Sequence, residues 1–153
     1  DALHDVATGV ADSAVVVGGG FIGIEMAENL VRRGLKVTIV ELADQILPPW
    51  DREMTTSLSS HLQSKGVELL LGESATQFED RENGVTVSLN SGGTLNASFA
   101  VLCIGVRPEN SLATDAGLEC GERGGIVTNA HMQTSDPDIY ASYAKSRISV
   151  VAL

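Results

Sequence analysis

The chain has 153 residues, of which 43% are hydrophobic and 20% are charged, and its formal net charge is −10. These values are typical of one globular domain with a hydrophobic core. Nucleic acid is not an expected partner, because binding a polyanion depends on Lys and Arg, and the chain has only 10 of them.

The sequence also indicates where the protein works. No apolar run approaches the roughly 18 residues of a membrane-spanning helix, and the first residues show no signal-peptide pattern. Cys103 and Cys120 match no metal-ligand spacing. We therefore expect a cytoplasmic protein with no membrane partner and no metal site.

The first half of the chain predicts alternating strands and helices. Residues 1–12 are expected to be a polar leader or a truncated segment. The apolar run 14–17 predicts a strand buried on both faces, and 36–42 predicts a second strand. Between them, apolar residues recur at helical spacing until Gly34. The members of this helical stripe are Ile22, Met26, Ala27, Leu30 and Val31.

A second helix and a third strand follow. Asp51 is a good N-cap, and Met54, Leu58 and Leu62 form the apolar stripe of a helix that ends near Gly66. Residues 67–72 then predict a third buried strand. The order β-α-β-α-β indicates a doubly wound parallel sheet.

The pattern changes after this point. Asn83-Gly84 is a hairpin signal between 76–80 and 84–90, and a turn at 91–93 leads to 94–98. These segments predict an antiparallel meander in place of a third helix. The apolar run 99–105 predicts the next strand of the parallel sheet, and a short strand is expected at 125–129.

The junction of the first strand and helix carries a glycine motif. Gly18, Gly20 and Gly23 are spaced as G-x-G-x-x-G. The first allows a tight turn, the second lets a pyrophosphate approach the backbone, and the third lets helix and strand pack closely. The helix N-terminus then holds the phosphate charge. Glu41 closes the second strand 23 positions after Gly18, where an acid that binds a ribose is expected. The residues alone leave open whether the dinucleotide is NAD or FAD.

Three segments resemble a known family: "AVVVGGGFIGIEMAENL", "VTIVELADQILPPWDREM" and "VLCIGVRPEN". Together they are similar to the NAD(H)-binding domain of the pyridine nucleotide-disulfide oxidoreductases, most closely the branch of coenzyme A-disulfide reductase, NADH oxidase and NADH peroxidase. The resemblance covers about residues 13–140. It implies an α/β, Rossmann-type three-layer NAD(P)-binding domain, whose parallel sheet carries an antiparallel β-meander crossover.

The resemblance also implies the site. Gly18, Gly20, Phe21, Ile22 and Gly23 would lie along the pyrophosphate, and Glu41 would bind the adenosine ribose. Glu25 would lie near the nicotinamide, although it could instead be a first-turn acid that suits the helix dipole. Gly105 would face the nicotinamide side of the cleft. Residues 42–44 include no Arg or Lys to receive a 2′-phosphate, so we expect NADH to be preferred to NADPH.

The implied parent enzyme passes hydride from NADH to FAD. Its FAD domain would be the partner of this domain, and a homodimer is possible. The flanking FAD segments and the redox cysteine of the family do not occur in this sequence, so we expect the isolated chain to be inactive. An FAD-binding use of the same motif, and a non-catalytic nucleotide-binding module, remain as alternatives.

Three features have simpler interpretations. After "DPDIYA" the family has a Gly-Asp pair, whereas this chain continues with residues 142–145. We therefore expect 141–153 to be an atypical tail, and a vector, a frameshift and a truncation are the alternative origins. Cys103 lies in an apolar strand and is expected to be a buried packing residue. Trp50 follows two prolines and is expected to anchor a loop.

Overall fold

The structure is a computed structural model that describes residues 9–141 and 146–147. The chain divides into two compact units, with the boundary between Ile104 and Gly105. Each unit is described by itself. The predicted domain, 13–140, therefore spans both units. Most of the predicted leader and tail, namely 1–8, 142–145 and 148–153, lies outside the described residues.

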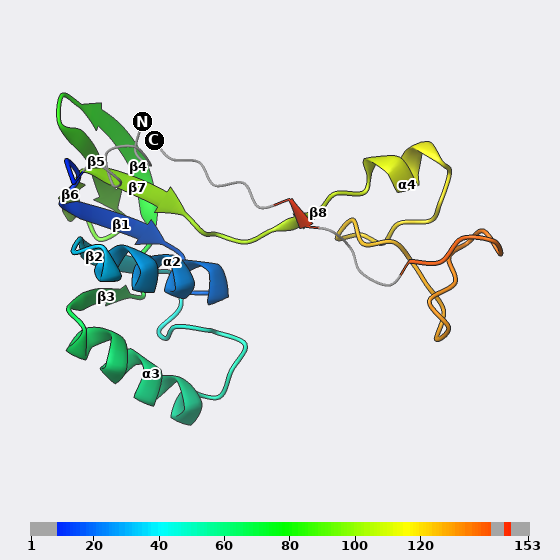
Figure 1. The fold of residues 1–153 in the computed structure, drawn as a ribbon, viewed down its shortest axis with the longest axis horizontal. Coiled ribbons are helices and arrows are strands. Elements are labelled where there is room, and N and C mark those ends of the chain that lie inside the picture. Colours follow the sequence, from blue (N-terminus) through cyan, green and yellow to red (C-terminus); the bar gives the residue numbers. More distant parts are fainter. Residues whose placement is uncertain (1–8, 142–145, 148–153) are drawn as a thin grey trace. The chain divides into compact units, whose positions relative to one another are not determined.

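A four-stranded parallel sheet forms the centre of the first unit (Figure 1). All of its neighbouring strands pair in parallel, in the order β3-β2-β1-β7. The strands are β1 (Ser13–Val17), β2 (Lys36–Glu41), β3 (Val67–Leu71) and β7 (Phe99–Leu102). The prediction of a parallel, doubly wound sheet is confirmed.

Two helices cover one face of this sheet. Helix α2 (Phe21–Arg32) connects β1 to β2, and α3 (Arg52–Ser64) connects β2 to β3. Alternate residues of β1 divide between two cores, because successive strand side chains point to opposite faces. Val16 packs in the core that contains Leu30 of α2 and Leu62 of α3, whereas Val15 packs in the core on the other face.

An antiparallel meander covers that other face. It consists of β4 (Ala75–Arg81), β5 (Gly84–Leu89) and β6 (Thr94–Ala97), in the order β4-β5-β6. The side chains of Val85, Val87 and Leu89 pack against Val15 and Val17 of β1. Helices, parallel sheet and meander form three layers, so the predicted three-layer α/β fold with a β-meander crossover is confirmed.

Two local predictions are wrong. Strand β3 is not buried on both faces, because it is the last strand of the sheet: only Val67 is buried, and Leu71 is 36% exposed. Met54 is 58% exposed, and Thr55 takes the buried position in the first turn of α3. The prediction of Asp51 as the N-cap residue of α3 is confirmed, although its side chain makes no capping hydrogen bond.

The second unit begins at Gly105 and contains short elements. Strand β8 (Arg107–Pro108) pairs antiparallel with β9 (Ser146–Arg147), and α4 (Ser111–Asp115) is a helix that the sequence did not predict. The strand predicted at 125–129 is reduced to an isolated bridge between Cys120 and Ile126. Among the described residues of both units, no helix is long and apolar enough to cross a membrane.

Candidate cofactor site

The turn between β1 and α2 requires glycine at its first position. Gly18 has φ +109°, in the region that favours glycine. A Cβ added there would lie 2.4 Å from the carbonyl oxygen of Cys103, which follows β7. The turn therefore passes so close to the neighbouring strand end that a side chain is excluded.

Gly23 is required for a different reason. It is buried in the first turn of α2, and an added Cβ would lie 1.9 Å from the carbonyl oxygen of Gly18. The backbone of the helix thus packs directly on the backbone of the turn. This is the packing role that the sequence assigned to the third glycine of the motif.

Gly20 differs from both. It is the N-cap residue of α2, with φ −78°, and an added Cβ would meet no atom within 4 Å. No side chain in the described structure caps this helix. The first N–H groups of a helix have no partner within the helix, and they favour an anion at that position. Open space beside Gly20 and an uncapped helix end fit a pyrophosphate.

Glu41 connects this turn to the second strand. It is the last residue of β2 and is half-buried. Its Oε2 accepts a hydrogen bond of 2.6 Å from the N–H of Gly19, and its Oε1 accepts one of 2.8 Å from the N–H of Ala43. A carboxylate has about four lone-pair sites, so two remain for the hydroxyl groups of a ribose.

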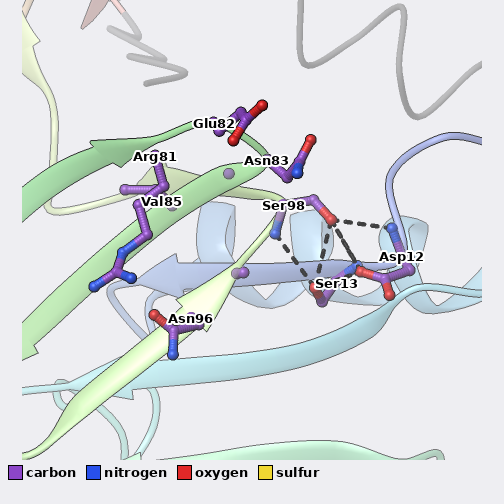
Figure 2. A pocket seen from close by; sticks show the side chains of 10 residues that line it. Asp12, Ser13, Arg81, Glu82, Asn83, Val85, Asn96 and Ser98 are labelled. Atoms are coloured by element: carbon purple, nitrogen blue, oxygen red, sulfur yellow. Dashed lines mark hydrogen bonds between the residues drawn. The ribbon is translucent and has the colours of Figure 1, made fainter.

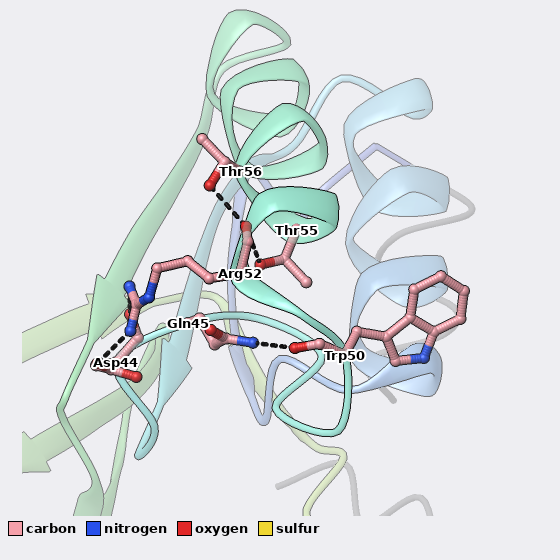
Figure 3. A network of polar contacts seen from close by, with 6 residues as sticks. All are labelled: Asp44, Gln45, Trp50, Arg52, Thr55 and Thr56. Atoms are coloured by element: carbon pink, nitrogen blue, oxygen red, sulfur yellow. Dashed lines mark hydrogen bonds and ion pairs between the residues drawn. The ribbon is translucent and has the colours of Figure 1, made fainter.

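The loop after β2 folds back onto the glycine turn. The N–H of Leu47 donates to the carbonyl of Gly19 at 2.9 Å. Trp50 meets Phe21, the first residue of α2, in an edge-to-face contact with ring centroids 6.0 Å apart. Gln45 Nε2 donates to the carbonyl of Trp50 at 2.7 Å (Figure 3). Trp50 therefore anchors this loop at the helix start, in agreement with the sequence interpretation.

The same loop carries an ion pair that sequence reasoning missed. Arg52, the first residue of α3, pairs through Nη2 with the Oδ2 of Asp44 (Figure 3). Its Nη1 also donates to the backbone carbonyl of Asp44 at 3.5 Å. The two residues are eight positions apart across a loop, so no helical or strand period relates them. The path of the loop brings them together.

The remaining predicted site residues are placed as follows. Ile22 is half-buried in the first turn of α2, and Glu25 is exposed. The alternative role of Glu25 as a first-turn acid is wrong, because the first turn contains no acidic residue and Glu25 follows it. Gly105 has φ +119° and is the first residue of the second unit. Its predicted place on the nicotinamide side stays a prediction.

Cys103 has no partner for nucleophilic chemistry among the described contacts. Its backbone N–H donates to the carbonyl of Val17 at 2.7 Å. Its side chain is half-buried against the core that the helices cover. Burial raises the pKa of its thiol above the usual value. No three His, Cys, Asp or Glu side chains in the described ranges are grouped so that they could hold a metal ion.

A cavity of about 600 Å³ lies elsewhere, at the amino-terminal end of β1 and the tip of the β4–β5 hairpin (Figure 2). Three of its polar residues bond one another: Ser98 Oγ accepts from the N–H of Asp12, and Ser13 Oγ donates to the Asp12 carboxylate at 2.7 Å. Ligands of parallel α/β sheets bind at the carboxyl ends of the strands. The cavity is at the opposite edge, so the glycine turn stays the candidate cofactor site.

The fold and this site define a dinucleotide-binding α/β domain. The family model for pyridine nucleotide-disulphide oxidoreductases matches residues 1–142. The chain therefore belongs to the pyridine nucleotide-disulphide oxidoreductase family, which is a family of enzymes, and the resemblance noted from the sequence is confirmed.

Known proteins agree with this assignment. An NADH oxidase from Enterococcus faecalis is 40% identical over 134 residues, which are 86% of this chain and 30% of the oxidase. The crystal structure of reduced CoADR-RHD from Bacillus anthracis is 43% identical with a TM-score of 0.81, over 90% of this chain and 24% of that one. The chain thus spans about a third or less of the length of these relatives.

Other structures include bound cofactors. The water-forming NADH oxidase from Lactobacillus brevis, bound to NADH, is 27% identical with a TM-score of 0.81, over 97% of this chain and 35% of that one. Its engineered NADPH-oxidising variant, bound to NADPH, is 30% identical with a TM-score of 0.79, over 91% and 30% of the two chains. A Desulfovibrio vulgaris relative (41% identity, TM-score 0.77, over 86% and 34% of the two chains) is described as FAD-dependent. The expected cofactors, NAD(H) with FAD in the parent enzyme, agree with these relatives.

Proposed function

We propose that this chain is the NADH-binding part of a FAD-dependent oxidoreductase and that it positions NADH for hydride transfer to the flavin. One observation supports this most directly: the carboxylate of Glu41 is hydrogen-bonded to the N–H of Gly19 within the glycine turn. The proposed ribose acid and the proposed pyrophosphate turn are thereby held next to each other.

Each part of the site has a task in this proposal. The open side of Gly20 admits the pyrophosphate, and the start of α2 supplies N–H donors and the positive end of the helix dipole. The two unused lone-pair sites of Glu41 accept the adenosine ribose hydroxyls. When both cofactors are bound, NADH supplies the hydride and the flavin accepts it, so the protein contributes binding and orientation.

The choice of NADH over NADPH rests on Glu41. A 2′-phosphate would place a like charge against its carboxylate. Two unit charges about 4 Å apart repel by roughly 1 kcal/mol in water and roughly 4 kcal/mol at an effective dielectric near 20. This corresponds to roughly a fivefold to several hundredfold preference for NADH.

The substitutions of the engineered relative also support a role for Glu41 in the choice between NADH and NADPH. Its substitutions replace a glycine, an aspartate 18 positions later and a proline seven positions after that. Arginine replaces the proline and also the residue that follows the aspartate. This chain has Gly23, Glu41 and Pro48 at the same spacing. The unsubstituted enzyme is described as an NADH oxidase and the engineered one as an NADPH oxidase.

The rest of the parent enzyme would supply the flavin and the electron acceptor. The second unit exposes apolar side chains, including Leu112 at 85% and Tyr140 at 62%, which suits packing against a further domain. The 153-residue chain alone is proposed to be colourless and inactive with disulfide, peroxide or oxygen. The homodimer and the cytoplasmic location stay predictions.

Binding isotherms for NADH, NADPH and FAD on the wild-type chain, the Glu41→Arg variant and the exposed control Glu122→Arg test this function. We expect wild type and control to prefer NADH, and Glu41→Arg to narrow or invert the preference. FAD binding at the glycine turn in place of NADH, or a Glu41→Arg variant that keeps the full preference for NADH, would refute the proposal.

A further inference from the structure

We propose that Arg52 is a second determinant of nucleotide choice: it exchanges the carboxylate of Asp44 for the 2′-phosphate of NADPH. This inference rests on the proposed nucleotide site and concerns how strongly that site rejects NADPH. The sequence offered no cation next to Glu41 in residues 42–44, but the fold brings Arg52 to that loop.

The position of Arg52 relative to the ribose acid follows from a short series of contacts. Glu41 Oε1 accepts the N–H of Ala43 at 2.8 Å, and Asp44 is the next residue. Arg52 contacts both the carboxylate and the backbone carbonyl of Asp44. The guanidinium therefore lies beside Asp44 (Figure 3), which follows Glu41 by three positions in the chain.

The substitutions of the engineered relative fall on the same loop. By their spacing they correspond to Leu42, Ala43 and Pro48, in the segment that separates Glu41 from Arg52. If the arginines introduced at two of these positions receive the 2′-phosphate, the phosphate would lie over this loop. Arg52 reaches the loop from the start of α3, a position that the engineered substitutions leave untouched.

The ion pair between Arg52 and Asp44 is weak enough for Arg52 to exchange its partner. The side chains of Arg52 and Asp44 are 58% and 78% exposed, and an ion pair that is open to solvent contributes little. A phosphate monoester carries more negative charge than a carboxylate and presents three oxygens to the planar guanidinium. Arg52 would therefore prefer the phosphate once NADPH binds, and Asp44 competes with it.

The exchange predicts effects of opposite sign for the two partners. Arg52→Gln removes the cation, so NADPH should bind about threefold to fivefold more weakly relative to NADH. Asp44→Asn releases the cation, so the NADPH-to-NADH affinity ratio should rise by a similar factor. In the double variant the gain from Asp44→Asn should disappear, because it acts through Arg52.

The experiment is a set of NADH and NADPH isotherms at low and high salt on the full chain and its three variants. The matched control is Glu28→Gln, which breaks another exposed ion pair, between Glu28 and Arg32 on α2, at 2.6 Å. We expect the control to leave the NADPH-to-NADH ratio unchanged and high salt to shrink the effects of both single variants.

Three results would overturn the inference: an Arg52→Gln variant with an unchanged ratio, two single variants that shift the ratio in the same direction, or an Asp44→Asn gain that persists without Arg52. The last result would mean that Asp44 acts by repulsion alone. All of these differ from failure of the proposed function, which is measured on the wild-type chain and the Glu41→Arg variant: the wild-type chain would bind FAD in place of NADH, or the Glu41→Arg variant would keep the full preference for NADH.

Discussion

The carboxylate of Glu41 accepts a 2.6 Å hydrogen bond from the backbone N–H of Gly19, across 22 positions of sequence. This bond joins the end of β2 to the glycine turn that precedes α2. The residue proposed to bind the ribose is thus held against the turn proposed to bind the pyrophosphate. Under that proposal, the hydrogen bond reduces the ordering that binding would otherwise require.

Glu41→Gln should weaken the hydrogen-bonded link between β2 and the glycine turn. A glutamine side chain has one acceptor oxygen, so it cannot accept from both Gly19 and Ala43, and its NH₂ group faces one of the two N–H donors. We expect about 1–2 kcal/mol loss of unfolding free energy, because hydrogen bonds to charged groups are among the stronger ones. Urea denaturation measures it, with the exposed Glu122→Gln as control. An unchanged midpoint of urea denaturation would contradict the role of Glu41 in linking β2 to the glycine turn.

Gly20→Val should abolish NADH binding and leave the fold intact. An added Cβ at Gly20 meets no protein atom within 4 Å, and φ −78° suits any residue. The side chain would instead occupy the space proposed for the pyrophosphate. Calorimetry measures binding and circular dichroism measures the fold. Gly125→Val, which also adds its Cβ in open space, is the control and should bind normally. Undiminished NADH affinity in Gly20→Val would place the nucleotide elsewhere.

Gly23→Ala, unlike Gly20→Val, should lower the stability of the fold. Its Cβ would lie 1.9 Å from the carbonyl oxygen of Gly18, so the turn and the helix must separate. Overpacking of this kind typically costs about 1–3 kcal/mol. The engineered relative carries alanine at the position that matches by spacing, so we expect a folded but less stable chain. A thermal unfolding midpoint equal to that of wild type would show that the turn relaxes without cost.

The sequence predicted the elements whose periodicity is long and regular. The valines of β1, the stripe of α2 and the Asn83-Gly84 turn each have a local signal, and the structure places a strand, a helix and a hairpin there. The glycine spacing also predicted which backbones meet, since Gly18 and Gly23 touch where the motif requires.

The missed features depend on information that no local pattern contains. The pairing of Asp44 with Arg52 follows from the path of a loop. Helix α4 has only five residues, too few to show a helical period. The exposure of Leu71 depends on the position of β3 at the sheet edge, which strand composition does not reveal.

Cys103 should react slowly with alkylating reagents. Burial raises the pKa of its thiol above its usual value, so less of the reactive thiolate is present at pH 8 than for an exposed thiol. We expect the rate of iodoacetamide labelling to rise about tenfold per pH unit until the pH passes this pKa. The Cys120→Ser variant leaves Cys103 as the only cysteine, so its labelling can be measured alone. In denaturant the labelling rate of Cys103 should rise to that of a small free thiol. Labelling of the folded protein at that rate at pH 8 would contradict the burial of Cys103.

The fluorescence of Trp50 should report NADH binding. Trp50 is the only tryptophan of the chain, and it contacts Phe21, the residue after Gly20. A nucleotide held at the glycine turn would therefore bind close to its ring. NADH absorbs light in the range where tryptophan emits, so its binding should quench the emission through energy transfer.

The quenching of Trp50 should saturate as the NADH concentration rises. The oxidised form lacks this absorption and should quench much less. The Gly20→Val variant keeps Trp50 but should lose the saturable component, which separates binding from simple absorption of light by free NADH. Equal quenching in the variant and the wild type would mean that the signal does not arise at the glycine turn.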